Sequence, residues 1–141
     1  MALKDAQPAA DVPRPEVIVD FKCEDGVLFV VLKNTGQRSA YRVSAEFDKP
    51  LYGLGGTKRI SELALFRRVE FMPAGKEFVQ LVDPAAAWFR RRGPTRFAIT
   101  LSYADREGHK YGERIIHDLK IYRDLGYSKI LHAGAQYEST D

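Results

Sequence analysis

The segment GLGGTK, residues 53–58, is the part of the sequence most similar to a phosphate-binding loop. Glycines let backbone N–H groups approach an anion closely, and a lysine beside them adds positive charge. A Walker loop, however, ends in Gly-Lys-Ser/Thr, and here Thr57 separates Gly56 from Lys58. The spacing therefore indicates a turn between two strands.

The groups that could perform acid–base chemistry are few. The three histidines, His109, His117 and His132, form no recognised metal-binding motif with Cys, Asp or Glu. We therefore expect no metal, no cofactor and no catalytic residue. An enzyme would have to use the polar residues near the last two predicted strands, namely Tyr103, Asp105, His109, His117 and Asp118.

Basic residues provide the other candidate site. Residues 51–100 contain nine Lys/Arg against four Asp/Glu, although the whole chain has a net charge of only +3. The candidate binding residues are Lys58, Arg59, Arg67, Arg68, Arg90, Arg91 and Arg92. Such a patch suits nucleic acid, acidic lipid or an acidic partner. A solvated charged surface is the simpler alternative, and cations at the end of a helix also stabilise its dipole.

A period of two in hydrophobicity predicts the elements that would position these residues. We expect strands over residues 17–23, 27–32, 40–47, 67–72, 77–82, 95–103 and 111–122. Asp25-Gly26 predicts a tight turn between the first two strands. In the third strand, Tyr41, Val43, Ala45 and Phe47 alternate with polar residues and should face the core.

One helix is predicted within DPAAAWFRRRG, residues 83–93. Asp83 suits the N-cap, Pro84 the first helical position and Gly93 the position after the C-cap. Residues 61–66, SELALF, fit either a helical turn or a short strand.

These elements predict an all-β fold, an antiparallel sandwich of about seven strands with one short inserted helix. We expect a flexible leader over residues 1–15, one domain over 16–122 and a tail over 123–141. The length of 141 residues and the 45% hydrophobic content fit a single domain with one core.

The sequence gives weaker indications of compartment. No apolar run approaches the roughly 20 residues that span a bilayer, and the first residues lack a secretory signal pattern. The single cysteine, Cys23, is expected to be buried and fits a reducing compartment. We therefore expect a cytoplasmic location, although a domain of a membrane-anchored protein would have the same composition.

Three segments resemble immunoglobulin-like bacterial modules, including those of the CARDB type. The junction LKNTGQRSAYRVSAEF matches the pattern N-x-G-x-x-x-A-x-x-V at Asn34, Gly36, Ala40 and Val43. FMPAGKEFVQLV resembles the turn before a strand in these modules, and LSYADREGHKY resembles their closing hairpin. The resemblance covers residues 16–122 and implies scaffold, spacer or binding roles without catalytic residues.

Two hypotheses for function follow. The first is a non-catalytic protein-interaction or scaffold module that uses a loop or an open edge strand. The alternative is a binder of an anionic surface, nucleic acid or acidic lipid, through the arginine-rich patch.

Overall fold

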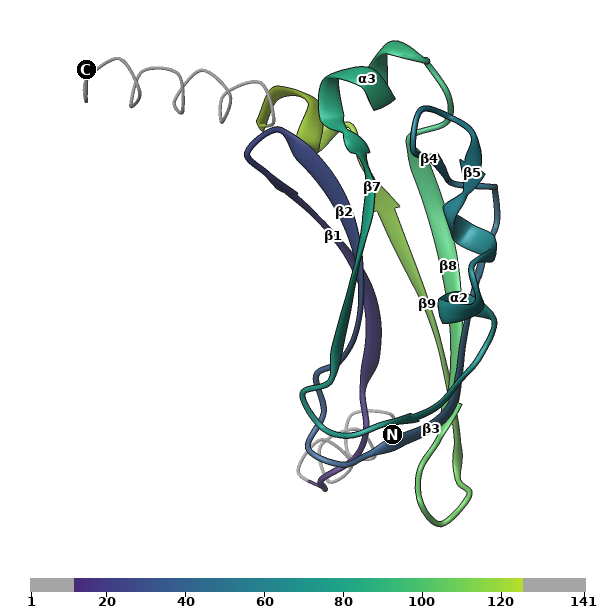
Figure 1. Ribbon diagram of the computed structural model, residues 1–141. Helices are drawn as coiled ribbons and strands as arrows, with labels where there is room; N and C mark the ends of the chain where they lie inside the picture. The colour runs from purple at the N-terminus through teal and green to yellow at the C-terminus, as the bar shows by residue number, and fades with distance from the viewer. Residues whose placement is uncertain (1–11, 126–141) are drawn as a thin grey trace, which may run out of the picture.

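The computed structural model describes residues 12–125, which form two antiparallel sheets packed face to face (Figure 1). The first sheet has the order β1-β2-β7, with β1 at Val17–Glu24, β2 at Val27–Asn34 and β7 at Glu77–Pro84. The second has the order β6-β3-β8-β9, with β6 at Val69–Met72, β3 at Ala40–Phe47, β8 at Arg96–Ala104 and β9 at Lys110–Asp118. The predicted all-β sandwich is therefore confirmed.

The core lies between the sheets and is filled by alternate residues of the long strands. β1 contributes Val17, Val19 and Phe21, and β8 contributes Phe97, Ile99 and Leu101, all at most 2% exposed. Cys23 is buried on the same face of β1, as predicted. The first two strands are joined at Asp25 and Gly26, which both have positive φ angles. This is the tight turn that the Asp-Gly pair predicted.

Shorter elements gather around the sandwich. A hairpin of β4 (Tyr52–Gly53) and β5 (Lys58–Arg59) leads into the 3-10 helix η1 (Ile60–Glu62) and α2 (Ala64–Arg67), and α3 (Ala85–Arg90) follows β7. Residues 61–66 are thus mostly helical. The last predicted strand ends at Asp118 and is followed by a turn and by helical residues 121–125, which lie beside α3 (Figure 1). No helix among residues 12–125 is long and apolar enough to cross a membrane.

Helix α3 begins and ends differently from the sequence prediction. Its N-cap is Pro84, whose ring has no acceptor for a side-chain cap hydrogen bond. The Asp83 carboxylate is bonded instead to Gly55 N–H and to the Arg91 side chain. Its C-cap is Arg91, and the left-handed residue that follows is Arg92 (φ +56°) rather than Gly93. An arginine therefore occupies the position that usually holds glycine.

The third strand contains a β-bulge. Arg42 has a φ of +51°, and the register of β3 against β8 shifts between Tyr41 and Ser44. The extra residue turns Tyr41 to the outer face, where its ring contacts the exposed Phe71 at 5.3 Å between centroids. Tyr41 is therefore not a core residue as predicted, whereas Val43 and Ala45 are buried.

The junction after β2 is organised by the fully buried side chain of Asn34. Its Oδ1 accepts hydrogen bonds from the N–H groups of Glu16 (3.1 Å) and Gly36 (3.0 Å). Its Nδ2 donates to the carbonyl oxygens of Arg38 (2.8 Å) and Met72 (3.0 Å). All four hydrogen-bonding positions of the amide are used, so the residue joins both sheets.

Gly36 is required by close packing and not by a positive φ angle. A Cβ atom here would clash with the carbonyl oxygen of Arg14 and lie 2.5 Å from the Glu16 nitrogen. Pro15 is buried, and Gln37 N–H donates to the Arg14 carbonyl at 3.0 Å, so the folded unit includes the last residues of the predicted leader. The rest of the predicted leader (1–11) and most of the predicted tail (126–141) lie outside the described residues.

Candidate functional site

The predicted basic patch is distributed over several elements, and four of its seven residues are bonded locally. Arg59 forms an ion pair with Glu62 at 2.7 Å and donates to the Tyr52 hydroxyl at 3.2 Å. Arg67 Nε donates to the Glu62 carbonyl at 3.1 Å. Arg68 pairs with Glu70 at 2.7 Å. These contacts explain three of the predicted residues without an external ligand.

Arg91 also has a structural partner. Its Nη2 lies 2.7 Å from Oδ2 of Asp83, whose side chain is only 3% exposed, and the other oxygen, Oδ1, accepts a hydrogen bond from Gly55 N–H at 3.0 Å. The carboxylate thus ties β7, the β4–β5 turn and the end of α3 together. Trp88 adds a second link, because its Nε1 donates to the Tyr52 carbonyl at 3.0 Å.

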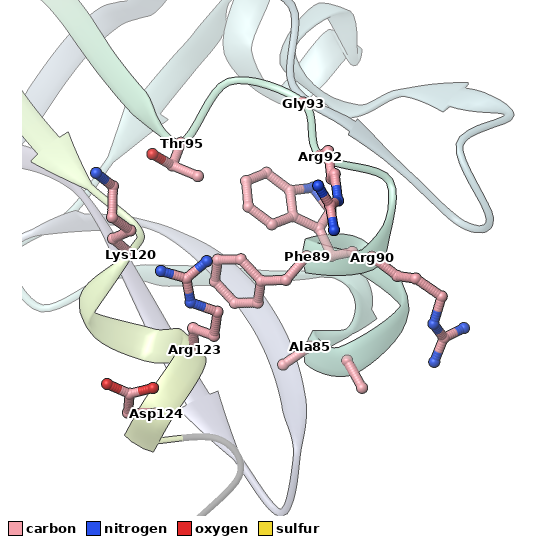
Figure 2. Close-up of a pocket in the computed structure, with 11 residues that line it drawn as sticks. Ala85, Phe89, Arg90, Arg92, Gly93, Thr95, Lys120, Arg123 and Asp124 are labelled. Atoms are coloured by element: carbon pink, nitrogen blue, oxygen red, sulfur yellow. The ribbon is translucent and has the colours of Figure 1, made fainter.

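Among residues 12–125, the other three patch residues, Lys58, Arg90 and Arg92, have no ion pair. The alternative prediction of an anionic-surface binder that uses all seven residues therefore has weak geometric support. Arg90 and Arg92 line a groove of about 830 Å³ at the end of the sandwich where α3 lies. The residues opposite them are Lys120, Arg123 and Asp124 (Figure 2).

Sequence reasoning missed Lys120 and Arg123 because it placed Lys120 in a strand over residues 111–122 and Arg123 in the tail. The turn after Asp118 brings both side chains to the groove, and the Arg123 guanidinium lies over the Phe89 ring at 5.9 Å. No local sequence pattern indicates that Arg123 lies across the groove from Gly93, because the two residues are 30 positions apart. It results from the tertiary fold alone.

The polar residues considered for catalysis fall into two separate groups on β8 and β9. Tyr103 and Asp105 lie near the 105–109 turn, whereas His117 and Asp118 lie at the opposite end of β9. Tyr111, beside the turn, and His117 are six positions apart on β9. This is about 20 Å along a strand, so the two groups lie far apart.

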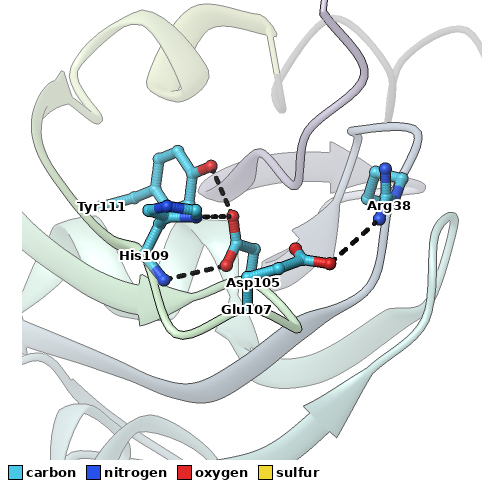
Figure 3. A network of polar contacts seen from close by, with 5 residues as sticks. All are labelled: Arg38, Asp105, Glu107, His109 and Tyr111. Carbon is cyan, nitrogen blue, oxygen red and sulfur yellow. Dashed lines mark hydrogen bonds and ion pairs between the residues drawn. The ribbon is translucent and has the colours of Figure 1, made fainter.

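Asp105 organises the β8–β9 turn (Figure 3). One carboxylate oxygen accepts the His109 N–H at 2.9 Å, and the other contacts His109 Nδ1 and accepts the Tyr111 hydroxyl, both at 3.0 Å. Desolvation acts to raise the pKa of Asp105, but these hydrogen bonds outweigh it and hold the pKa below its ordinary value. Burial is the largest cause that raises the pKa of Tyr111, and the hydrogen bond to Asp105 raises it further.

Glu107 brings a third potential metal ligand to this turn. The ligand atoms of Asp105, Glu107 and His109 lie within 4.8 Å of one another. The Asp105 oxygens are already occupied by hydrogen bonds within the turn, and Glu107 lies 3.8 Å from Arg38 (Figure 3). The arrangement therefore matches a hydrogen-bonded hairpin turn, and these bonds account for it without an ion.

The family described as "Domain of unknown function (DUF8453)" matches residues 1–123, which include every β-strand of the described residues 12–125 and nearly all of the groove. The chain belongs to this family. No curated protein matches the sequence.

In this DUF8453 domain, β7 is an edge strand whose outer side is only partly covered. Leu54 N–H donates to the Val82 carbonyl at 2.7 Å, so the β4–β5 hairpin covers the end near α3. Within the described part of the chain, residues 77–81 have no backbone partner on that side. Val79 and Leu81 point outward and are 46% and 42% exposed.

Proposed function

We propose that this domain is a non-catalytic protein-interaction module that binds an extended segment of a partner protein along β7. The observation that carries the proposal is the uncovered edge of residues 77–81, together with the exposed side chains of Val79 and Leu81. A partner strand would gain backbone hydrogen bonds from the edge and apolar contacts from alternate side chains.

The backbone and side chains of β7 both suit this role. In an antiparallel pair, alternate residues direct their N–H and C=O groups away from the neighbouring strand. The side chain of Gln80 donates to the Leu81 carbonyl at 2.9 Å, a weak local bond that an incoming N–H group would replace. Val79 and Leu81 lie opposite Val31 and Phe29 of β2, and of these two Val31 is buried and Phe29 is partly exposed.

The other edge strands are less suited to pairing. β6 has only four residues. β9 exposes Lys110, Glu113 and Arg114, and charged side chains on an edge oppose pairing with another chain. Two carbonyls of β1 are occupied, since Val19 O contacts His117 Nε2 at 2.8 Å and Phe21 O accepts the Tyr122 hydroxyl at 2.9 Å.

We also propose that the sandwich is of the immunoglobulin-like class. The arrangement of strands β1-β2-β7 against β6-β3-β8-β9 supports this, because consecutive strands cross between two antiparallel sheets as in such folds. Fold alone does not determine function, so the functional proposal rests on the β7 edge itself.

The test is a selection of linear peptides of about ten residues, long enough for one strand, from a random display library. We expect the selected peptides to slow amide hydrogen exchange in residues 77–81. Leu81→Lys should weaken their binding by about tenfold or more, a loss of about 1.4 kcal/mol. The matched control is Ile116→Lys, at an equally exposed position on the β9 edge strand.

Two results would contradict the proposal. The library could yield no peptide that binds the folded domain. Alternatively, the peptides could bind Leu81→Lys as tightly as the unmodified domain while both proteins unfold at the same temperature.

A further inference from the structure

The groove beside α3 brings together three cationic side chains from two distant parts of the chain. Arg92 lies just after α3, and Lys120 and Arg123 follow β9. None of the three has an ion pair within residues 12–125. Figure 2 shows the Arg123 guanidinium beside the Phe89 ring, whereas the Arg90 side chain points away from Phe89. Three cations that line one groove and have no ion pair among the described residues favour an anionic ligand.

Acidic groups near the groove compensate only part of this charge. Asp124 is the one acidic residue among the described residues that line the groove, against the basic residues Arg90, Arg92, Lys120 and Arg123. Asp118 accepts a hydrogen bond from Lys120 N–H at 3.1 Å. The hydrogen bond from Lys120 N–H is the largest cause that lowers the pKa of Asp118. A hydrogen bond from Thr95 and the charges of Lys120 and Arg96 lower it further, and desolvation opposes them in part. The groove therefore keeps an excess of positive charge at neutral pH.

The floor of the groove is apolar. Ala85 and Ala86 line it beside Phe89, and the ring of Trp88 meets Phe89 edge-on at 5.0 Å. A volume of about 830 Å³ falls within the range of small-molecule sites, roughly 300–1,000 Å³. A ligand that fits both parts of the groove has an anionic head and an apolar or planar body.

The chemistry of the cations points to phosphate as the anionic head. Guanidinium groups match phosphate oxygens through paired N–H donors, and lysine adds a compact charge. A phosphate monoester carries up to two negative charges, which three cations can neutralise. We propose that this groove binds an organic phosphate, with the phosphate group held by Arg92, Lys120 and Arg123 and the organic part lying along Phe89.

The backbone at Arg92, at the end of α3, agrees with this assignment. Its φ of +56° is a conformation in which glycine is favoured, yet the chain has arginine here and glycine at the next position. Strained residues of this kind concentrate at functional sites. Arg92 is among the residues that line the groove (Figure 2).

The proposal is tested by calorimetric titration of the full chain at low salt. The probes are a nucleoside monophosphate, a short-chain phosphatidic acid and inorganic phosphate, with the unphosphorylated nucleoside and diacylglycerol as controls. We expect at least one organic phosphate to bind more tightly than inorganic phosphate and than its own control. The probe that binds identifies the source of the phosphate, nucleotide or lipid.

Variants then localise the binding. Arg123→Gln and Arg92→Gly should each weaken it about tenfold, because each removes one charge-assisted contact. Glycine suits a positive φ angle, so Arg92→Gly should unfold at or above the temperature of the unmodified chain. Arg68→Gln is the control, since Arg68 is paired with Glu70 away from the groove. Leu81→Lys should leave phosphate binding unchanged, which separates this site from the β7 edge.

Three results would overturn the proposal. The first is that no organic phosphate binds at millimolar concentration. The second is that inorganic phosphate or an unphosphorylated control binds as well as the organic phosphate. The third is that Arg92→Gly and Arg123→Gln bind as tightly as Arg68→Gln.

Discussion

The Nε2 atom of His117, on the edge strand β9, lies 2.8 Å from the carbonyl oxygen of Val19 on the edge strand β1. A carbonyl can only accept, so this ring nitrogen carries the proton. The ring also meets Phe21 edge-on at 5.1 Å. One side chain thus connects the two sheets on this side of the sandwich and explains the histidine in structural terms.

His117→Ala should destabilise the fold by about 1–2 kcal/mol, because it leaves the Val19 carbonyl without its donor and removes the aromatic contact. Urea unfolding would measure the change. His109→Ala is the matched control and should cost below about 0.5 kcal/mol, since that side chain is 73% exposed. Equal effects of the two substitutions would contradict the structural role of His117.

Gly36→Ala should destabilise the fold by about 3 kcal/mol, because the added methyl group would clash with the backbone of Arg14 and Glu16. Thermal unfolding provides the measurement. Gly112→Ala is the control, because its Cβ would meet Leu101 O at an ordinary 3.8 Å. If Gly36→Ala melts at the same temperature as the unmodified chain, the close approach is not a constraint on the fold.

Arg91→Ala should cost about 2–3 kcal/mol, since it leaves the buried carboxylate of Asp83 without its cation. Arg90→Ala, at the neighbouring position, should cost below about 0.5 kcal/mol. Adding Asp83→Asn to Arg91→Ala should recover part of the loss, because it removes the unpaired charge. A double variant less stable than Arg91→Ala would show that charge pairing is not what holds this corner together.

Asp105 should make the fold sensitive to acid. Its folded pKa lies below the ordinary 3.8, so its contribution is present above about pH 4 and is lost as the pH falls through the folded pKa. We expect Asp105→Asn to be less stable than the unmodified chain at neutral pH, with a difference that shrinks below pH 3.8. Melting temperatures measured from pH 7 to pH 2 test this.

The control for this experiment is Glu107→Gln, which leaves the hydrogen bonds of the turn intact and should follow the profile of the unmodified chain. A difference between Asp105→Asn and the unmodified chain that is the same at every pH would rule out the ionised carboxylate as its source.

The strands were predictable because strands such as β1 and β8 alternate between core and solvent and β2 is a continuous apolar run, and both patterns are local. Tyr41 shows where local reasoning fails. One extra residue at Arg42 inverts the alternation, and an arginine with positive φ carries no sequence signal for a bulge. Asp83 shows the same limit, since its local context suggested an N-cap whereas its partners are Gly55 and Arg91.

The groove was beyond sequence prediction for a related reason. Arg92 was recognised as part of a basic run, but the residues that complete the groove, Lys120 and Arg123, come from a segment predicted as strand and tail. A basic run in sequence is a poor guide to a basic surface in space. Arg59, Arg68 and Arg91 each have an acidic partner in the fold.

The hydrogen bonds of Asn34 have a consequence for the order of folding. Its partners are 2, 4, 18 and 38 positions away in sequence, so all four bonds exist only when β1, β2 and β6 are in place. Contacts that close long loops form late unless they belong to the folding nucleus. Asn34→Ala should therefore accelerate unfolding more than it slows folding, as a denaturant-dependence of both rates would reveal. Asn34 would then set the lifetime of the folded domain by slowing its unfolding.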